Sequence, residues 1–111
     1  MAKETVRKNL VDAINELTKL LEVCKDPNER FELRIKIREL FQRLDRVIVA
    51  TLDSETPEFS EAVESLKALT KKAKEARAHL DKVADTINAA GEAINKVEKL
   101  VKNIAGVLAI L

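Results

Sequence analysis

The chain has 111 residues, of which 46% are hydrophobic and 35% are charged, with two Gly, two Pro and one Cys. Its 20 basic and 19 acidic residues give a formal net charge of +1, too small to attract nucleic acid strongly. This composition excludes a disordered chain and a disulfide-rich scaffold. It predicts one all-helical domain over residues 1–111.

A first helix is predicted from about residue 3 to residue 25. Its apolar residues recur at alternating spacings of four and three, which places them on one stripe of a helix: Val6, Leu10, Ala13, Leu17, Leu20 and Cys24. The helix ends at Asp26-Pro27, because Pro disfavours helical geometry in the residue before it. Asp26 can then cap a second helix that has Pro27 at its first position.

The second helix is predicted from residue 27 to about residue 52. Leu33, Leu40 and Leu44 lie on its main apolar stripe, and Phe31 and Phe41 broaden that stripe. We therefore interpret both of these Phe residues as core residues, as we do Phe59. A connection this short forces two helices into an antiparallel hairpin, which is predicted over residues 1–52.

Residues 53–57 form the clearest break in the chain, and Thr56-Pro57 is typical of a helix start. A seven-residue apolar repeat then continues without a slip from Phe59 to Leu111, with no charged residue on it. This pattern predicts a long third helix over about residues 57–110, with the heptad repeat over 58–111, packed on the hairpin as in a bundle or a coiled coil.

The second half of this repeat raises a problem of length. A third helix of that size would span about 80 Å, against about 37 Å for the second helix, so its end would overhang the hairpin. From about Val83 the positions beside the repeat also become apolar, and a stripe that wide needs cover. Either a second copy or another protein covers it, or the chain folds back near Asn88–Gly91 into a closed four-helix bundle. We favour the continuous helix, because Ala89 and Ala90 are good helix formers.

The chain offers few residues for chemistry. It has no glycine-rich phosphate loop, no HExxH motif and no Cys/His cluster, and its one His, His79, has only Glu75 as a nearby carboxylate on the same helical face. We expect no enzymatic activity, no catalytic or metal-binding residues, no cofactor and no small-molecule substrate. A row of arginines on the second helix is interpreted as a solvated, salt-bridged face rather than an anion site: Arg30, Arg34, Arg38, Arg43 and Arg46.

The expected function is that of a non-enzymatic protein–protein interaction module that acts by helix–helix association, as a homo-oligomer (a dimer) or with a protein partner. The predicted interface is the apolar C-terminal half of the long helix: Ile87, Ile94, Val97, Val101, Ile104 and Leu108. The alternative is a membrane-active, pore-forming type of protein whose amphipathic C-terminal helix enters a bilayer. The lone Cys24, on an apolar stripe, and the lack of a recognisable signal peptide or spanning stretch lead us to expect a cytoplasmic protein.

Overall fold

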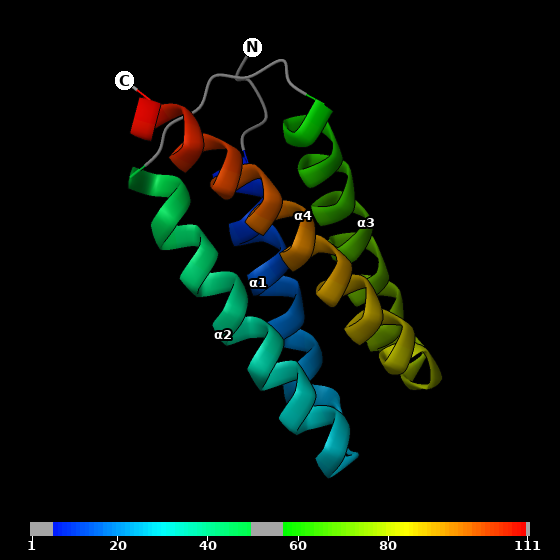
Figure 1. The fold of residues 1–111 in the computed structure, drawn as a ribbon. Helices are drawn as coiled ribbons and strands as arrows, with labels where there is room; N and C mark the ends of the chain where they lie inside the picture. The colour runs from blue at the N-terminus through cyan, green and yellow to red at the C-terminus, as the bar shows by residue number, and fades with distance from the viewer. Residues whose placement is uncertain (1–5, 50–56, 111) are drawn as a thin grey trace.

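Four helices pack together in the computed structural model, which describes residues 6–49 and 57–110 (Figure 1). The elements are α1 (Val6–Val23), α2 (Pro27–Val49), α3 (Pro57–Ala78), the 3-10 turn η1 (Leu80–Lys82) and α4 (Val83–Ile110). Side chains are described for residues 6–46, 57 and 59–102. The predicted all-α fold is confirmed, and no residue within the described ranges lies in a strand.

The turn between α1 and α2 is formed as the sequence predicts. An Asp26 carboxylate oxygen accepts hydrogen bonds from the backbone N–H groups of Asn28, at 2.8 Å, and Glu29, at 3.0 Å. These bonds satisfy two of the N–H groups that a helix start leaves without an intrahelical partner. Pro27 is the first residue of α2, where its missing N–H costs nothing. The predicted N-cap and antiparallel hairpin are both confirmed.

The C-terminal end of α1 is stabilised by a side chain from α2. The Arg30 guanidinium donates to the backbone carbonyls of Leu21, at 2.7 Å, and Cys24, at 2.9 Å. Carbonyls at a helix C-terminus lack intrahelical partners and carry partial negative charge, so a guanidinium is well suited to bind them. One Arg of the row is thus part of the hairpin turn rather than of a solvated face.

The predicted continuous helix over residues 57–110 is wrong. Helix α3 ends at Ala78, and the chain reverses through His79 and η1 so that α4 returns along α3 (Figure 1). The alternative, a four-helix bundle, describes the arrangement, but its break lies at His79 and not at Asn88–Gly91. Gly91 sits inside α4.

Local hydrogen bonding explains how the reversal occurs without Gly or Pro. The backbone N–H of His79 still donates to Glu75 O at 3.0 Å, and the N–H of Lys82 donates to His79 O at 2.9 Å. A 3-10 turn takes about three residues, close to the 3.6 residues of the helical turn it replaces. The apolar repeat therefore stays in step across the break, although Leu80, which lies on it, is exposed.

Each helix packs against two others. Helix α1 contacts α2 and α3, and α4 contacts α2 and α3, so that α1 and α4 face each other diagonally across the bundle. Figure 1 shows α1 running in the same direction as α3, and α2 in the same direction as α4. The two antiparallel hairpins, α1–α2 and α3–α4, are therefore joined side by side through parallel helices.

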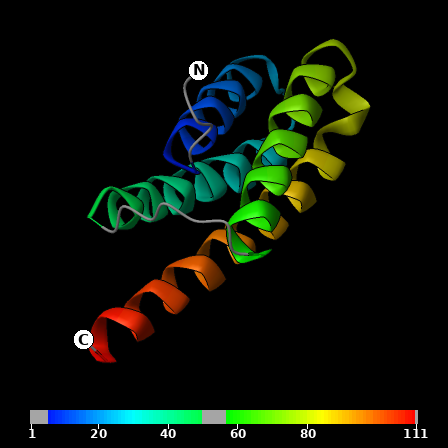
Figure 2. The same cartoon turned by 90° about the horizontal axis from the view of Figure 1, so that it is seen from above.

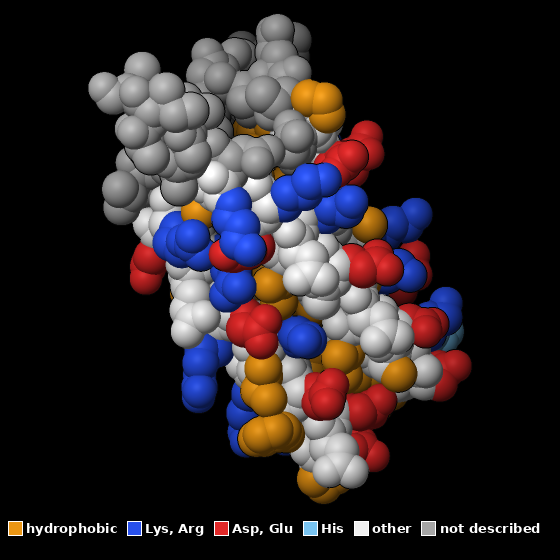
Figure 3. Space-filling model, viewed as in Figure 1, with side chains coloured by type: hydrophobic (Ala, Val, Ile, Leu, Met, Phe, Trp, Pro, Cys, Tyr) orange, Lys and Arg blue, Asp and Glu red, His pale blue; other side chains and the backbone are white. Residues whose placement is uncertain are grey.

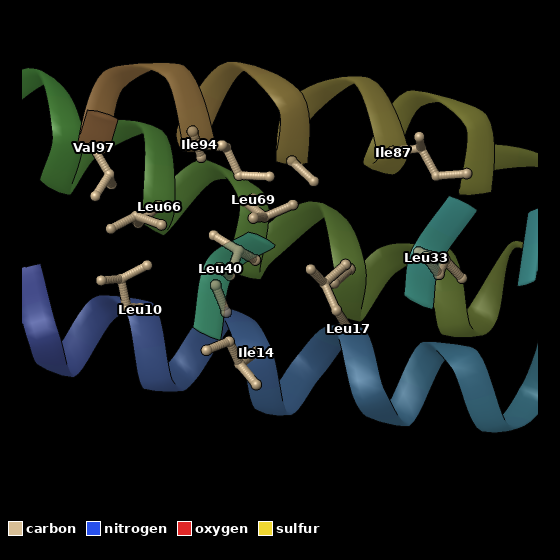
Figure 4. Close-up of a cluster of buried hydrophobic side chains, with 14 of the residues drawn as sticks. Leu10, Ile14, Leu17, Leu33, Leu40, Leu66, Leu69, Ile87, Ile94 and Val97 are labelled. Atoms are coloured by element: carbon tan, nitrogen blue, oxygen red, sulfur yellow. The ribbon is translucent and has the colours of Figure 1, made fainter. Parts of the chain in front are cut away.

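Aliphatic side chains from all four helices form one core (Figure 4). The fully buried leucines come from α1, α2 and α3, and α4 contributes mainly β-branched residues: Leu10, Leu17, Leu20, Leu33, Leu40, Leu66 and Leu69, with Val83 and Val97. Residues at three- and four-residue spacings share one helix face, so these positions converge on the centre.

Small residues let α4 approach α3 closely. Ala73 and Ala76 on α3, and Ala90 on α4, are completely buried. The hydroxyl of the buried Thr86 lies 3.3 Å from the Lys72 carbonyl on α3, in addition to 3.1 Å from Lys82 O on its own helix. A side chain as short as Thr reaches a neighbouring backbone only where no large side chain separates the helices. The alanine-rich first half of the repeat is thus the surface that receives α4.

The C-terminal end of α4 projects away from the other helices in the view from above (Figure 2). Helix α4 has 28 residues and α3 has 22, so the longer helix outruns its partner by six residues, about 9 Å at the rise of an α-helix. This short extension of α4 differs from the overhang predicted from the sequence, in which half of a 54-residue helix lay beyond the hairpin.

Replacing Gly91 tests the position of the break. Gly91→Ala should stabilise the protein by about 0.5–1 kcal/mol, because Ala is the better helix former. The new Cβ would meet only the end of the Lys36 side chain, at 3.9 Å from Nζ. Chemical denaturation of both proteins measures the difference. Ala89→Gly, on the same helix, is the reciprocal control and should lose at least as much, because the Ala89 methyl group also packs against the core. Destabilisation by Gly91→Ala would contradict a helical Gly91.

Candidate functional site

Four of the six residues predicted to form a partner interface lie in the protein's own core. Ile87, Ile94, Val97 and Val101 are all buried by the other helices, and Figure 4 shows the first three directed toward α1, α2 and α3. The fold-back covers them with the same chain, so within this fold the four are core residues and are not exposed to a partner. Ile104 and Leu108 lie outside the described side chains, and their role stays a prediction.

Carboxylates and guanidinium groups join the helices at the rim of this core. Glu98 on α4 accepts two hydrogen bonds from Arg46 Nη1, at 3.0 and 2.9 Å, and its Oε2 lies 3.1 Å from Arg43 Nε. On the opposite side, Arg77 Nη2 on α3 lies 2.9 Å from Glu16 Oε1 on α1, whose carboxylate is largely buried. One cluster joins α2 to α4 and the other joins α1 to α3, so both connect the two hairpins.

The charges around Glu98 alter its titration. Burial by itself raises the pKa of the Glu98 carboxyl. The hydrogen bond from Arg46, together with the positive charges of Arg46 and Arg43, outweighs burial and holds this pKa below its ordinary value of 4.5. A group with a lowered folded-state pKa stabilises the protein above its unfolded pKa. That contribution is lost as the pH falls through the folded-state pKa.

The five arginines of the row on α2 differ in whether they have a partner within the protein. Arg30 caps α1, and Arg43 and Arg46 bind Glu98. Arg34 and Arg38 are exposed, and neither makes a hydrogen bond or ion pair with any residue for which the structure gives side chains. The predicted solvated, salt-bridged face is therefore confirmed in part: Arg43 and Arg46 form ion pairs, whereas Arg34 and Arg38 are solvated but form no salt bridge among the described side chains.

Both Phe residues of α2 are exposed as well. Phe31 retains 62% and Phe41 retains 50% of its accessible surface, whereas Phe59 packs against the core. The interpretation of Phe31 and Phe41 as core residues is wrong. The reason is angular, because at 100° per residue Phe31 lies about 160° around the helix from Leu33 and Phe41 lies about 100° from Leu40. A helical wheel drawn on Leu33 and Leu40 would have revealed this signal.

Together these residues form one continuous surface, which we call the outer face of α2: Phe31, Arg34, Arg38, Phe41 and Asp45. Their spacings alternate between three and four, so they share a stripe on the side of α2 that faces away from α1 and α4. Asp45 is exposed, and within the described side chains it too has no ionic partner. Figure 3 shows hydrophobic and basic side chains interleaved over the N-terminal half of α2.

The remaining reactive side chains do not assemble into a site. Cys24 is buried, and burial raises the pKa of its thiol, which keeps it in the less nucleophilic protonated form. His79 is exposed in the turn after α3. No group of three His, Cys, Asp or Glu side chains within the described ranges is arranged to hold a metal ion. The outer face of α2 is thus the feature of this surface that most needs an explanation.

Comparison with known proteins supplies no relative. No family model matches the sequence, and neither the curated proteins nor the solved structures contain a significant match. None of the described helices is both long and apolar enough to span a bilayer.

Replacing Ile94 separates a core residue from an interface residue. Ile94→Asp should unfold the bundle or destabilise it by more than about 3 kcal/mol, because it buries an unpaired carboxylate among aliphatic side chains. Circular dichroism during thermal unfolding measures this effect. An exposed change on the same helix, Asn95→Asp, is the matched control. A folded Ile94→Asp protein that has only lost self-association would restore the original interface prediction.

Replacing Glu98 tests the ionic link between α2 and α4. Glu98→Gln should lower the free energy of unfolding by about 1 kcal/mol near neutral pH, since a partly buried carboxylate loses two guanidinium partners. The difference from wild type should shrink as the pH falls below 4.5. Denaturation at a series of pH values checks both statements. Glu61→Gln, which removes a 3.4 Å pair with Lys96 between more exposed groups, should cost less than about 0.5 kcal/mol.

Proposed function

We propose that the protein is a non-enzymatic interaction module that acts by helix–helix association through the outer face of α2. The partner is a second copy of the chain or another helical protein. This proposal keeps the class of function expected from the sequence and moves its surface from α4 to α2.

The exposure of Phe31 and Phe41 carries the proposal. The chain has three Phe, no Trp and no Tyr, and two of its three aromatic side chains lie on one outward helix face. Covering a Phe side chain contributes roughly 1.5–3 kcal/mol, which intramolecular packing obtains at Phe59 but not at these two positions.

The chemistry of the neighbouring side chains supports the same surface. Arg38 lies between the two Phe positions, next to Arg34, and the guanidinium groups of both are unpaired among the described residues. Aromatic residues and Arg are the types that contribute most energy at protein interfaces, because they combine large contact area with directional hydrogen bonds. A partner helix that presents apolar and acidic residues at three- and four-residue spacings fits this face.

We also propose that the protein is cytoplasmic. Cys24 is buried and is the only Cys of the sequence, so a reducing compartment suits it. Ile104 and Leu108, on the last turns of α4, remain candidates for a second contact. Their sequence continues the apolar repeat beyond Val101.

A double substitution on α2 tests the proposed surface. Phe31→Ser with Phe41→Ser should weaken association at least about tenfold while leaving the fold intact, since both side chains are already exposed. Self-association is measured by sedimentation velocity, and binding to proteins of the native host by cross-linking followed by recovery of the tagged chain.

A matched control removes exposed apolar surface elsewhere. Val23 and Leu80 are 43% and 38% exposed and lie off the outer face of α2, so Val23→Ser with Leu80→Ser should leave association unchanged. If the control pair weakens binding and the Phe pair does not, α2 is not the interaction surface.

A further inference from the structure

We propose that the partner of α2 is the α2 helix of a second copy, packed antiparallel about a two-fold axis that passes between Glu39 and Leu40. This inference rests on the proposed function and specifies its partner. It follows from the order of side chains along the outer face of α2. When a second α2 runs antiparallel to the first, side chains of matching chemistry lie opposite each other.

The positions pair by simple symmetry. Arg34 and Asp45 lie equally far from the midpoint between residues 39 and 40, and so do Arg38 and Phe41. In an antiparallel helix pair a two-fold axis brings such positions opposite each other, because the contact is the same patch on both copies. Arg34 then meets the partner's Asp45, and Arg38 meets the partner's Phe41. Each contact occurs twice.

These contacts match the chemistry of the groups. Arg34 and Asp45 are oppositely charged, exposed and without an ionic partner among the described side chains. A guanidinium over an aromatic ring, as at Arg38 and the partner's Phe41, is attracted by the electron-rich ring face. Phe31 lies against the end of the partner's α2, which reduces its exposure.

The heptad pattern allows more than one antiparallel register, and the charges favour the one with its axis between Glu39 and Leu40. The outer face repeats at alternating three- and four-residue spacings, as required for antiparallel packing of two helices. An axis through residue 36 would also align the stripe, and it would place Phe31 against the partner's Phe41. It would, however, set Arg34 against the partner's Arg38 twice, and like charges in direct contact disfavour an interface.

The positions beside the stripe do not oppose the pairing. Ile35 and Gln42, which flank the outer face on one side, are uncharged, so they bring no like charges together across the axis. Ile37 and Leu44, on the other flank, are partly buried against the bundle's own core. The contact involves one helix from each copy, so it is small, and we expect dissociation constants on the order of micromolar.

Charge exchange provides a test that only a self-complementary interface passes. Arg34→Glu places two carboxylates opposite each other in each homodimer contact, and Asp45→Lys places two cations there. Each variant alone should dimerise at least about tenfold more weakly than wild type. An equimolar mixture of the two variants can form a mixed dimer. In it, the new Glu at position 34 of one chain faces the new Lys at position 45 of the other, and the remaining Asp45 faces the remaining Arg34. The mixed dimer should therefore recover wild-type affinity.

Sedimentation velocity over micromolar concentrations measures all three samples, with circular dichroism to confirm folding. Glu64→Lys, an exposed charge reversal on α3, is the matched control and should dimerise like wild type. Recovery in the mixture establishes the antiparallel register. A monomeric wild type, single variants that dimerise as wild type does, or a mixture that stays monomeric overturns the inference.

Failure here is distinguishable from failure of the proposed function. If the wild-type chain is monomeric but binds a host protein, and Phe31→Ser with Phe41→Ser abolishes that binding, the outer face of α2 remains the interaction surface with a different partner. If those Phe substitutions change no association of any kind, the surface itself is excluded.

Discussion

Burial of the apolar face of α4 is the constraint on which the rest of the structure depends. Six large aliphatic side chains of this helix are covered by the other three: Val83, Ile87, Ile94, Val97, Leu100 and Val101. Covering each contributes roughly 1.5–3 kcal/mol, whereas a net backbone hydrogen bond is worth about 1 kcal/mol. Interrupting one helical turn at His79 is therefore favourable, particularly because the 3-10 turn keeps hydrogen bonds of its own. The alanine-rich surface of α3 provides the place into which α4 folds.

Once α4 occupies that place, two sets of charged residues differ in role. Those beside the core join the hairpins, with Glu98 bound by Arg43 and Arg46, and Glu16 beside Arg77. Those on the far side of α2 have no intramolecular partner among the described residues. The same helix thus stabilises the bundle with one part of its surface and presents an aromatic and ionic stripe with the other. The packing of the hairpins leaves this stripe of α2 exposed, and the proposed association uses that exposed stripe.

Prediction from the sequence succeeded where the signal is local. Asp26 caps α2 and Pro27 begins it because both preferences operate within one turn of chain. It failed at His79, since no Gly or Pro marks the reversal and the apolar repeat crosses it in step. It failed again at Phe31 and Phe41, because a hydrophobic residue near a stripe is easily counted as part of it. Their angle around the helix from Leu33 and Leu40 shows that these side chains point elsewhere, and in the folded bundle both remain exposed.

By itself the sequence determined that this chain is helical, that residues 27–49 pair with those before them, and that the region after Val83 needs cover. Composition, spacing and capping are properties of short segments, so they can be read without the fold. The tertiary structure decided what provides that cover. It is the chain itself, through a reversal at His79, because four helices of similar length bury more apolar surface than three with a long overhang. In consequence, Ile87, Ile94, Val97 and Val101 became core residues, and the exposed surface of interest passed to α2.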